Sequence, residues 1–195
     1  MSSGVHASHK VKRSLADEVL VRSCLLGDEE AWSALIDKYK SLIFSIPIRY
    51  GLSADDASDI FQSVCITLLR DLASVREPRA LVAWLIKATA RQCALFKRNR
   101  QAFVNTVIDE NTVPDTGSLP ETFVQDLERE QILRETIAEM QPECVRLIEF
   151  LFFSNPPLPY DRVAHALGFA KGSVGATRMR CLEKLRLALE KKGFC

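Results

Sequence analysis

Apolar residues recur every three or four positions along most of this chain, which is the spacing of one face of an α-helix. The pattern predicts one helix over residues 15–26, a second over residues 29–46 and a third that begins at Ser53. Asp28 is placed to cap the second helix, and Pro47 is expected to kink or end it. Because no stretch shows the strict apolar and polar alternation of a β-strand, the pattern predicts an all-α fold.

The predicted helices fall into two groups. Residues 81–96 complete the first group, and helices over residues 160–167 and 173–191 close the second. Between the groups, a stretch with Pro114 and Gly117 shows no useful periodicity, which indicates a linker. We therefore expect a disordered basic tail, a small helical domain, a flexible acidic linker and a second small helical domain (residues 1–14, 15–102, 103–125 and 126–192).

Charge is distributed unevenly, although the formal net charge is only +1. Residues 76–101 hold seven basic residues and one acidic residue, and residues 171–192 hold seven basic residues and two acidic ones. Residues 109–130 hold seven acidic residues and one basic one. Lys and Arg neutralise phosphates and release their counterions, so two basic blocks around an acidic connector indicate nucleic-acid binding.

A helix-turn-helix pattern stands near the C-terminus. Its first helix, residues 160–167, ends at Gly168, which can take the positive φ that a tight turn needs. Ser173 is expected to cap the second helix, and the small Ala164 lets the two helices cross closely. In such motifs the second helix enters the major groove of DNA. An ordinary helical hairpin is the alternative interpretation.

The side chains of this motif divide into a core and a contact surface. Four apolar residues are expected to share one core (Val163, Leu167, Val174 and Leu185). Candidate contacts to the bases and phosphates of DNA lie in the second helix and at its entry (Lys171, Ser173, Thr177, Arg178 and Arg180).

Several segments resemble the extracytoplasmic-function (ECF) sigma factors of the sigma-70 superfamily. Region 4 of that family is similar to the C-terminal segment LPYDRVAHALGFAKGSVGATRMRCLEKLRLAL. Regions 2.1 and 2.2 are similar to GDEEAWSALIDKYKSLIFSI and ADDASDIFQSVCITLLRDL. Regions 2.3 and 2.4 are similar to PRALVAWLIKATARQCALFKRNRQ. The order and separation of these segments make the resemblance specific.

The resemblance implies a sigma factor that binds core RNA polymerase and directs promoter-specific transcription initiation. Such a protein has no enzymatic activity of its own and needs no cofactor. Region 2 would dock on the clamp coiled coil of the polymerase and would melt and read the −10 element. Region 4 would bind the polymerase flap and read the −35 duplex. Members of the family are often held inactive by an anti-sigma factor, which adds a further candidate partner.

Candidate −10 contacts lie in the basic helix and in the loop before it (Arg76, Arg79, Trp84, Lys87, Arg91 and Arg98). Three of these cations recur at steps of four and seven and so share a helix face, and cations beside aromatic rings suit single-stranded DNA. Trp84 fits a core position equally well.

Candidate polymerase contacts cluster on the third helix (Asp55, Asp56, Asp59 and Gln62), where acidic residues also favour the helix dipole.

Two other classes of function fit parts of the sequence. A helix-turn-helix regulator would carry a sensing or dimerisation domain at its N-terminus. A nuclease would need clustered carboxylates for a metal ion, or a nucleophile with a base. The acidic residues here are spread along helices, so we expect neither an enzyme nor a metal site.

The six cysteines contain no C-x-x-C pair, and we expect buried apolar side chains and a loose terminal thiol rather than disulfides.

Apolar stretches fall far short of the ~20 residues that a membrane span needs. The polar N-terminus lacks the apolar middle of a signal peptide, so we expect a cytoplasmic protein. We expect it to be a monomer when unbound.

Overall fold

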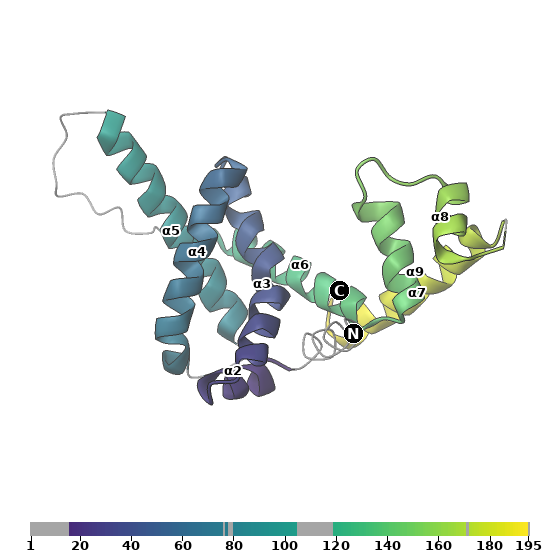
Figure 1. Cartoon of the computed structure of the whole chain (residues 1–195), viewed down its shortest axis with the longest axis horizontal. Coiled ribbons are helices and arrows are strands. Elements are labelled where there is room, and N and C mark those ends of the chain that lie inside the picture. Colours follow the sequence, from purple (N-terminus) through teal and green to yellow (C-terminus); the bar gives the residue numbers. More distant parts are fainter. Residues whose placement is uncertain (1–15, 76, 78–79, 105–118, 171, 195) are drawn as a thin grey trace. The chain divides into compact units, whose positions relative to one another are not determined.

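The computed structural model describes residues 16–75, 77, 80–104, 119–170 and 172–194. All regular elements among these residues are helical, which confirms the all-α fold (Figure 1). The chain divides into two compact units, residues 1–128 and residues 129–195, and each is described by itself. The predicted tail and most of the predicted linker lie outside the described residues.

Unit 1 is built on four helices, α2 (Asp17–Leu25), α3 (Glu29–Arg49), α4 (Ala54–Asp71) and α5 (Leu81–Val104). Helix α3 packs against the other three, and α4 also packs against α5. A 3-10 turn, Leu72–Ser74, follows α4. This arrangement leaves one side of α4 and one side of α5 available for other contacts.

The predicted start of α3 is confirmed, but the helix does not end at Pro47, which was one of the two outcomes expected there. The Asp28 carboxylate accepts a hydrogen bond from the Ala31 N–H at 3.1 Å, as a capping residue does. Pro47 lies inside α3, which continues to Arg49. The proline removes one N–H donor in the last turn, but the Tyr50 N–H still donates to the Ile46 carbonyl at 3.0 Å.

The core of unit 1 consists of aliphatic side chains from all four helices. Leu35, Leu42 and Ile43 of α3 are fully buried, and so are Leu68 of α4 and Leu85 of α5. Each such side chain contributes roughly 1.5–3 kcal/mol of favourable burial relative to an exposed position. The apolar residues whose spacing predicted these helices therefore face a common interior.

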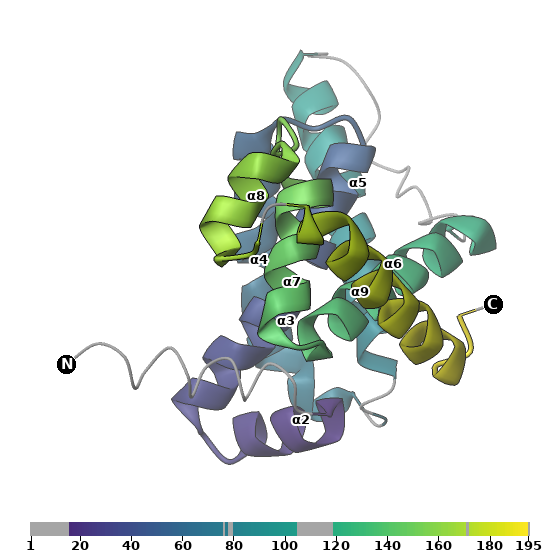
Figure 2. The ribbon, with the colours of Figure 1, turned by 90° about the vertical axis from the view of Figure 1, so that its right-hand side faces the viewer.

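Unit 2 contains a three-helix motif formed by α7 (Pro142–Ile148), α8 (Tyr160–Leu167) and α9 (Ser173–Lys191) (Figure 2). The limits predicted for the last two helices are confirmed. Helix α6 (Glu121–Glu139) begins in unit 1 and ends in unit 2. A π-helical turn, Glu149–Phe153, continues α7.

The predicted common core of the helix-turn-helix motif is wrong for one residue. Val163 and Val174 share a buried cluster, and Leu167 packs against it. Leu185 lies in a second cluster with Ile137 of α6. The first part of α9 packs on α8, and the later part of α9 packs on α6 and α7. The apolar residues of α9 therefore belong to two small cores.

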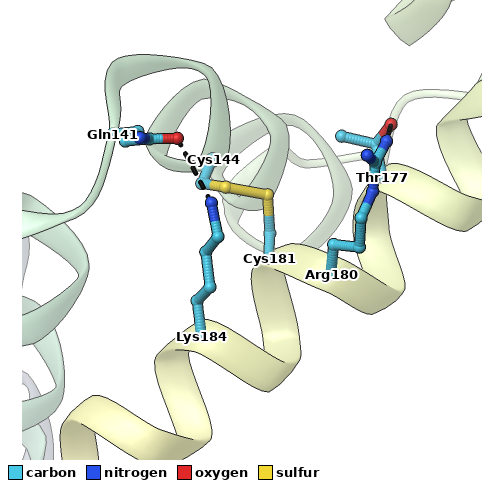
Figure 3. The surroundings of a disulfide bond; sticks show 6 residues. All are labelled: Gln141, Cys144, Thr177, Arg180, Cys181 and Lys184. Carbon is cyan, nitrogen blue, oxygen red and sulfur yellow. Dashed lines mark hydrogen bonds between the residues drawn. A yellow bond between two sulfur atoms is a disulfide. The ribbon is translucent and has the colours of Figure 1, made fainter.

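Cys144 of α7 and Cys181 of α9 form a disulfide (Figure 3). Both side chains are buried, their Cα atoms lie 5.4 Å apart, and 37 positions separate them in sequence. The expectation that the cysteines form no disulfide is therefore wrong for this pair. Spacing along the chain does not reveal which cysteines are brought together where two helices pack.

No helix in the described part of the chain is both long enough and apolar enough to cross a membrane.

Candidate nucleic-acid interfaces

A cavity of about 920 Å³ lies beside α5 in unit 1. Trp84, Lys87 and Arg91 line it, so three of the predicted −10 contacts are brought together. Lys87 and Arg91 are exposed, whereas Trp84 is half-buried and packs against the core. The cavity thus brings Trp84 together with Lys87 and Arg91, and the ion pair of Arg70 with Asp71 lines it as well.

The other predicted −10 contacts are not placed in this cavity. Arg98 is exposed on α5 but does not line the cavity. Arg76 and Arg79 lie outside the described residues. Because aromatic rings stack on bases and cations neutralise phosphates, Trp84, Lys87 and Arg91 form the part of this surface best suited to single-stranded nucleic acid.

The start of α6 and the residue two positions before it supply another wall of the cavity, through Glu121, Val124 and Leu119. These residues fall in the segment predicted to be linker. Leu119, Phe123 and Leu127 recur at steps of four, so their helical spacing is the sequence signal that could have revealed this contact.

Tyr50 joins the cavity to the start of α6. Its ring meets the Phe123 ring edge-on, with 6.1 Å between centroids, and the Lys97 ammonium lies 5.5 Å from the Tyr50 centroid. Burial, and secondarily the neighbouring Cys93, raises the pKa of the Tyr50 phenol. Burial also raises the pKa of the Cys93 thiol to about 12, so this group stays protonated near neutral pH.

A second candidate surface is a stripe of exposed residues along α4 (Asp55, Asp59, Gln62, Ile66 and Leu69). Steps of four and three place these residues on one face. Ile66 and Leu69, which are 68% and 64% exposed, were not among the predicted contacts. Their position opposite the buried face of α4 is the signal that could have identified them. The mixed polar and apolar stripe has the composition of a protein-binding surface.

Asp56, the fourth predicted polymerase contact, also forms bonds within unit 1. Its carboxylate accepts from the Ser53 N–H, and the Ser53 hydroxyl accepts from the Asp56 N–H, both at 3.1 Å. Arg100 of α5 lies 3.4 Å from the same carboxylate. The hydrogen bonds with Ser53, and to a lesser extent Arg100, hold the pKa of Asp56 below its usual value.

The third candidate surface is the helix-turn-helix of α8 and α9. Gly168 and Gly172 have φ values of +69° and +86°, which L side chains rarely adopt, and so fix the turn. The predicted cap is wrong, because Gly172 holds the cap position. Ser173 is the first residue of α9, and its hydroxyl donates to the Ala170 carbonyl.

The predicted contacts of α9 are on different sides of the helix. Arg180 is exposed and donates a hydrogen bond to the Thr177 hydroxyl at 3.1 Å (Figure 3). Arg178 follows Val174 by four and precedes Cys181 by three, so it shares their buried stripe, is half-buried, and has a buried Nε without a hydrogen bond. Lys171 lies outside the described residues.

Another cation of α9, Arg186, pairs within its own helix. Its guanidinium contacts the carboxylates of Glu183 and Glu190. The hydrogen bond with Glu183, followed by the charges of both glutamates, raises the pKa of Arg186. The exposed cations Arg180, Lys184 and Lys191 are spread along the rest of α9. Among the described residues, no group of His, Cys, Asp and Glu side chains is placed to hold a metal ion.

Comparison with known proteins identifies the family. Residues 35–103 match the Sigma-70 region 2 family. The ECF RNA polymerase sigma-E factors of Escherichia coli (strain K12) and Salmonella typhi are each 26% identical over 185 residues, which is 90% of this chain and 95% of each relative. The RNA polymerase sigma-H factor of Pseudomonas aeruginosa is 24% identical over 89% of this chain and 94% of its own length. The chain belongs to the ECF sigma factors of the sigma-70 family, which direct RNA polymerase to initiate transcription.

Proposed function

We propose that this sigma factor binds a promoter at two elements. Unit 1 would melt and read the −10 element, and unit 2 would read the −35 element. The observation that carries the proposal is the cavity on α5, where Trp84 lies with Lys87 and Arg91 inside the matched region 2 domain. A base can stack on the indole while the cations neutralise the neighbouring phosphates.

The helix-turn-helix supports the second half of the proposal. Its turn is fixed by two glycines, and α9 carries the exposed Arg180 beside the half-buried Thr177, whose hydroxyl accepts its hydrogen bond. Arginine is suited to paired hydrogen bonds with guanine in the major groove, and threonine offers a hydroxyl and a methyl group to base edges. We propose that these two residues read the −35 duplex and that Ser173 and Lys171 contact its backbone.

The α4 stripe is the proposed docking surface for the clamp coiled coil of core RNA polymerase. Ile66 and Leu69 supply exposed apolar area, and Asp55, Asp59 and Gln62 supply polar contacts at the edge. Unit 2 would contact the polymerase flap. An anti-sigma factor that covers the α4 stripe would block polymerase binding and so hold the protein inactive.

Reconstituted transcription tests this function directly. Purified protein and core polymerase are incubated with genomic promoter fragments, and the run-off products are sequenced. We expect products that start at defined positions, absent with core polymerase alone. The absence of any specific product across the fragments would contradict the proposal.

A further inference from the structure

The beginning of α6 packs on the core of unit 1, beside the cavity that the proposed −10 contacts of α5 also line. We call residues 119–127 the cover segment. Leu127 is fully buried in the same core cluster as the aliphatic side chains of α3 and α5. Leu119, Phe123 and Val124 pack against that cluster from its surface. The segment is therefore part of the folded unit 1.

The cover segment and the proposed DNA contacts share one cavity. Leu119 and Val124 line it together with Trp84. These two residues therefore border the apolar space beside Trp84 that a stacked base would occupy. The Glu121 side chain lines the same cavity as Lys87 and Arg91. A carboxylate near these cations lowers the positive potential that a DNA phosphate would meet.

Phe123 is the contact that can be weakened without opening the core. Its ring meets Tyr50 edge-on, and it is half-buried, whereas Leu127 is fully buried. Truncation of Phe123 removes an aromatic contact that holds the segment, while the buried anchor at Leu127 remains. Glu121 is exposed, so its charge can be removed with little effect on packing.

We propose that the cover segment is a built-in competitor of single-stranded DNA, which walls the cavity beside α5 in the unbound protein and is displaced when the −10 strand enters. The inference rests on the proposed function of α5. A ligand that binds only the uncovered state has an apparent Kd raised by the reciprocal of the uncovered fraction. Variants that loosen the segment should therefore bind single-stranded DNA more tightly.

The test measures binding of the full chain, without polymerase, to a fluorescein-labelled single-stranded DNA of about 15 mixed nucleotides by fluorescence anisotropy. We expect the Kd of Phe123→Ala to be about five-fold lower than that of the unmodified protein, which corresponds to an uncovered fraction of about one fifth. An unchanged or higher Kd would overturn the inference, because the segment would then be neutral or would help to bind DNA.

Two further variants serve as support and control. Glu121→Gln should lower the Kd for single-stranded DNA about two-fold, because it removes the carboxylate that competes with the DNA phosphates. If circular dichroism shows that Phe123→Ala has lost helix, the result for Glu121→Gln alone tests the inference. Phe153→Ala makes the same truncation at a phenylalanine of unit 2 that is 62% exposed, and it should leave the Kd unchanged.

Arg91→Ala separates this inference from the proposed function. If Arg91→Ala does not weaken DNA binding, the role of α5 itself is wrong. If Arg91→Ala weakens binding while Phe123→Ala and Glu121→Gln leave it unchanged, only the competition by the cover segment is wrong.

Discussion

Asp56 shows how a single carboxylate can stabilise the fold. It closes the capping box of α4 and pairs with Arg100 of α5. Its pKa is lowered in the folded protein, so its contribution to the free energy of unfolding is present above the ordinary carboxyl pKa and is lost as the pH falls below about 4.

Asp56→Asn should therefore make the free energy of unfolding depend less on pH in acid. We expect the free energy of unfolding of the unmodified protein to fall more steeply below about pH 4 than that of the variant. Urea unfolding followed by circular dichroism at a series of pH values measures this difference. Asp55→Asn, which removes an exposed carboxylate outside the capping box, is the matched control and should keep the steeper fall.

Lys87 and Arg91 should act on the melted strand rather than on polymerase. We expect Lys87→Ala and Arg91→Ala each to weaken open-complex formation and to reduce the slope of log Kd against log salt by about 0.7, the value for one phosphate of a single strand. Permanganate footprinting and a polymerase pull-down distinguish the two steps. Lys40→Ala on α3 is the control, and an equal loss in both assays would contradict the assignment.

Arg180 and Arg178 should behave differently, although both belong to the basic block of α9. Arg180→Ala should remove about 1–3 kcal/mol of discrimination at one or two base pairs of the −35 element. Arg178→Ala, on the buried stripe, should lower stability or overall affinity while keeping the base preference. Selection of −35 duplexes from a randomised pool measures both. A changed preference with Arg178→Ala alone would reverse the two roles.

Among the helices, α7 and α9 depend on each other through the disulfide between Cys144 and Cys181. The buried clusters of unit 2 are small, so a cross-link that restricts the unfolded chain matters more there than in unit 1.

Reduction of this disulfide should destabilise unit 2 by about 2–4 kcal/mol, because the cross-link closes a long loop of the unfolded chain. Urea unfolding with and without dithiothreitol measures the loss. The double variant Cys144→Ala and Cys181→Ala should be insensitive to dithiothreitol, whereas Cys65→Ala should remain sensitive. An equal midpoint for the unmodified protein in both conditions would show that the cross-link adds no stability.

At the scale of the whole molecule, two DNA contacts on one chain should require a fixed distance between the promoter elements. Inserting about 5 base pairs between them turns one element by roughly half a helical turn relative to the other. We expect a large fall in run-off product, because both contacts can no longer be made at once. The same insertion upstream of the −35 element is the control and should have no effect.

The all-α class and most helix limits could be predicted from the sequence, because helical spacing and turn residues are local signals. Asp28, Gly168 and the limits of α8 and α9 illustrate this. The candidate site was predicted less completely. Lys87 and Arg91 share a cavity as their spacing suggested, but Arg98, predicted on the same face, does not line it. The wall formed by Leu119 and its neighbours depends on a contact between segments far apart in sequence.

The sequence by itself determined the helices, the uneven charge and the resemblance to ECF sigma factors, since each depends on residue order and spacing. Tertiary structure decided which of these residues meet. It paired Cys144 with Cys181, placed Asp56 in a capping box, placed Arg178 on the buried stripe and brought the start of α6 to the cavity beside α5. Such pairings follow from how helices pack around a core, and packing joins residues that local spacing cannot connect.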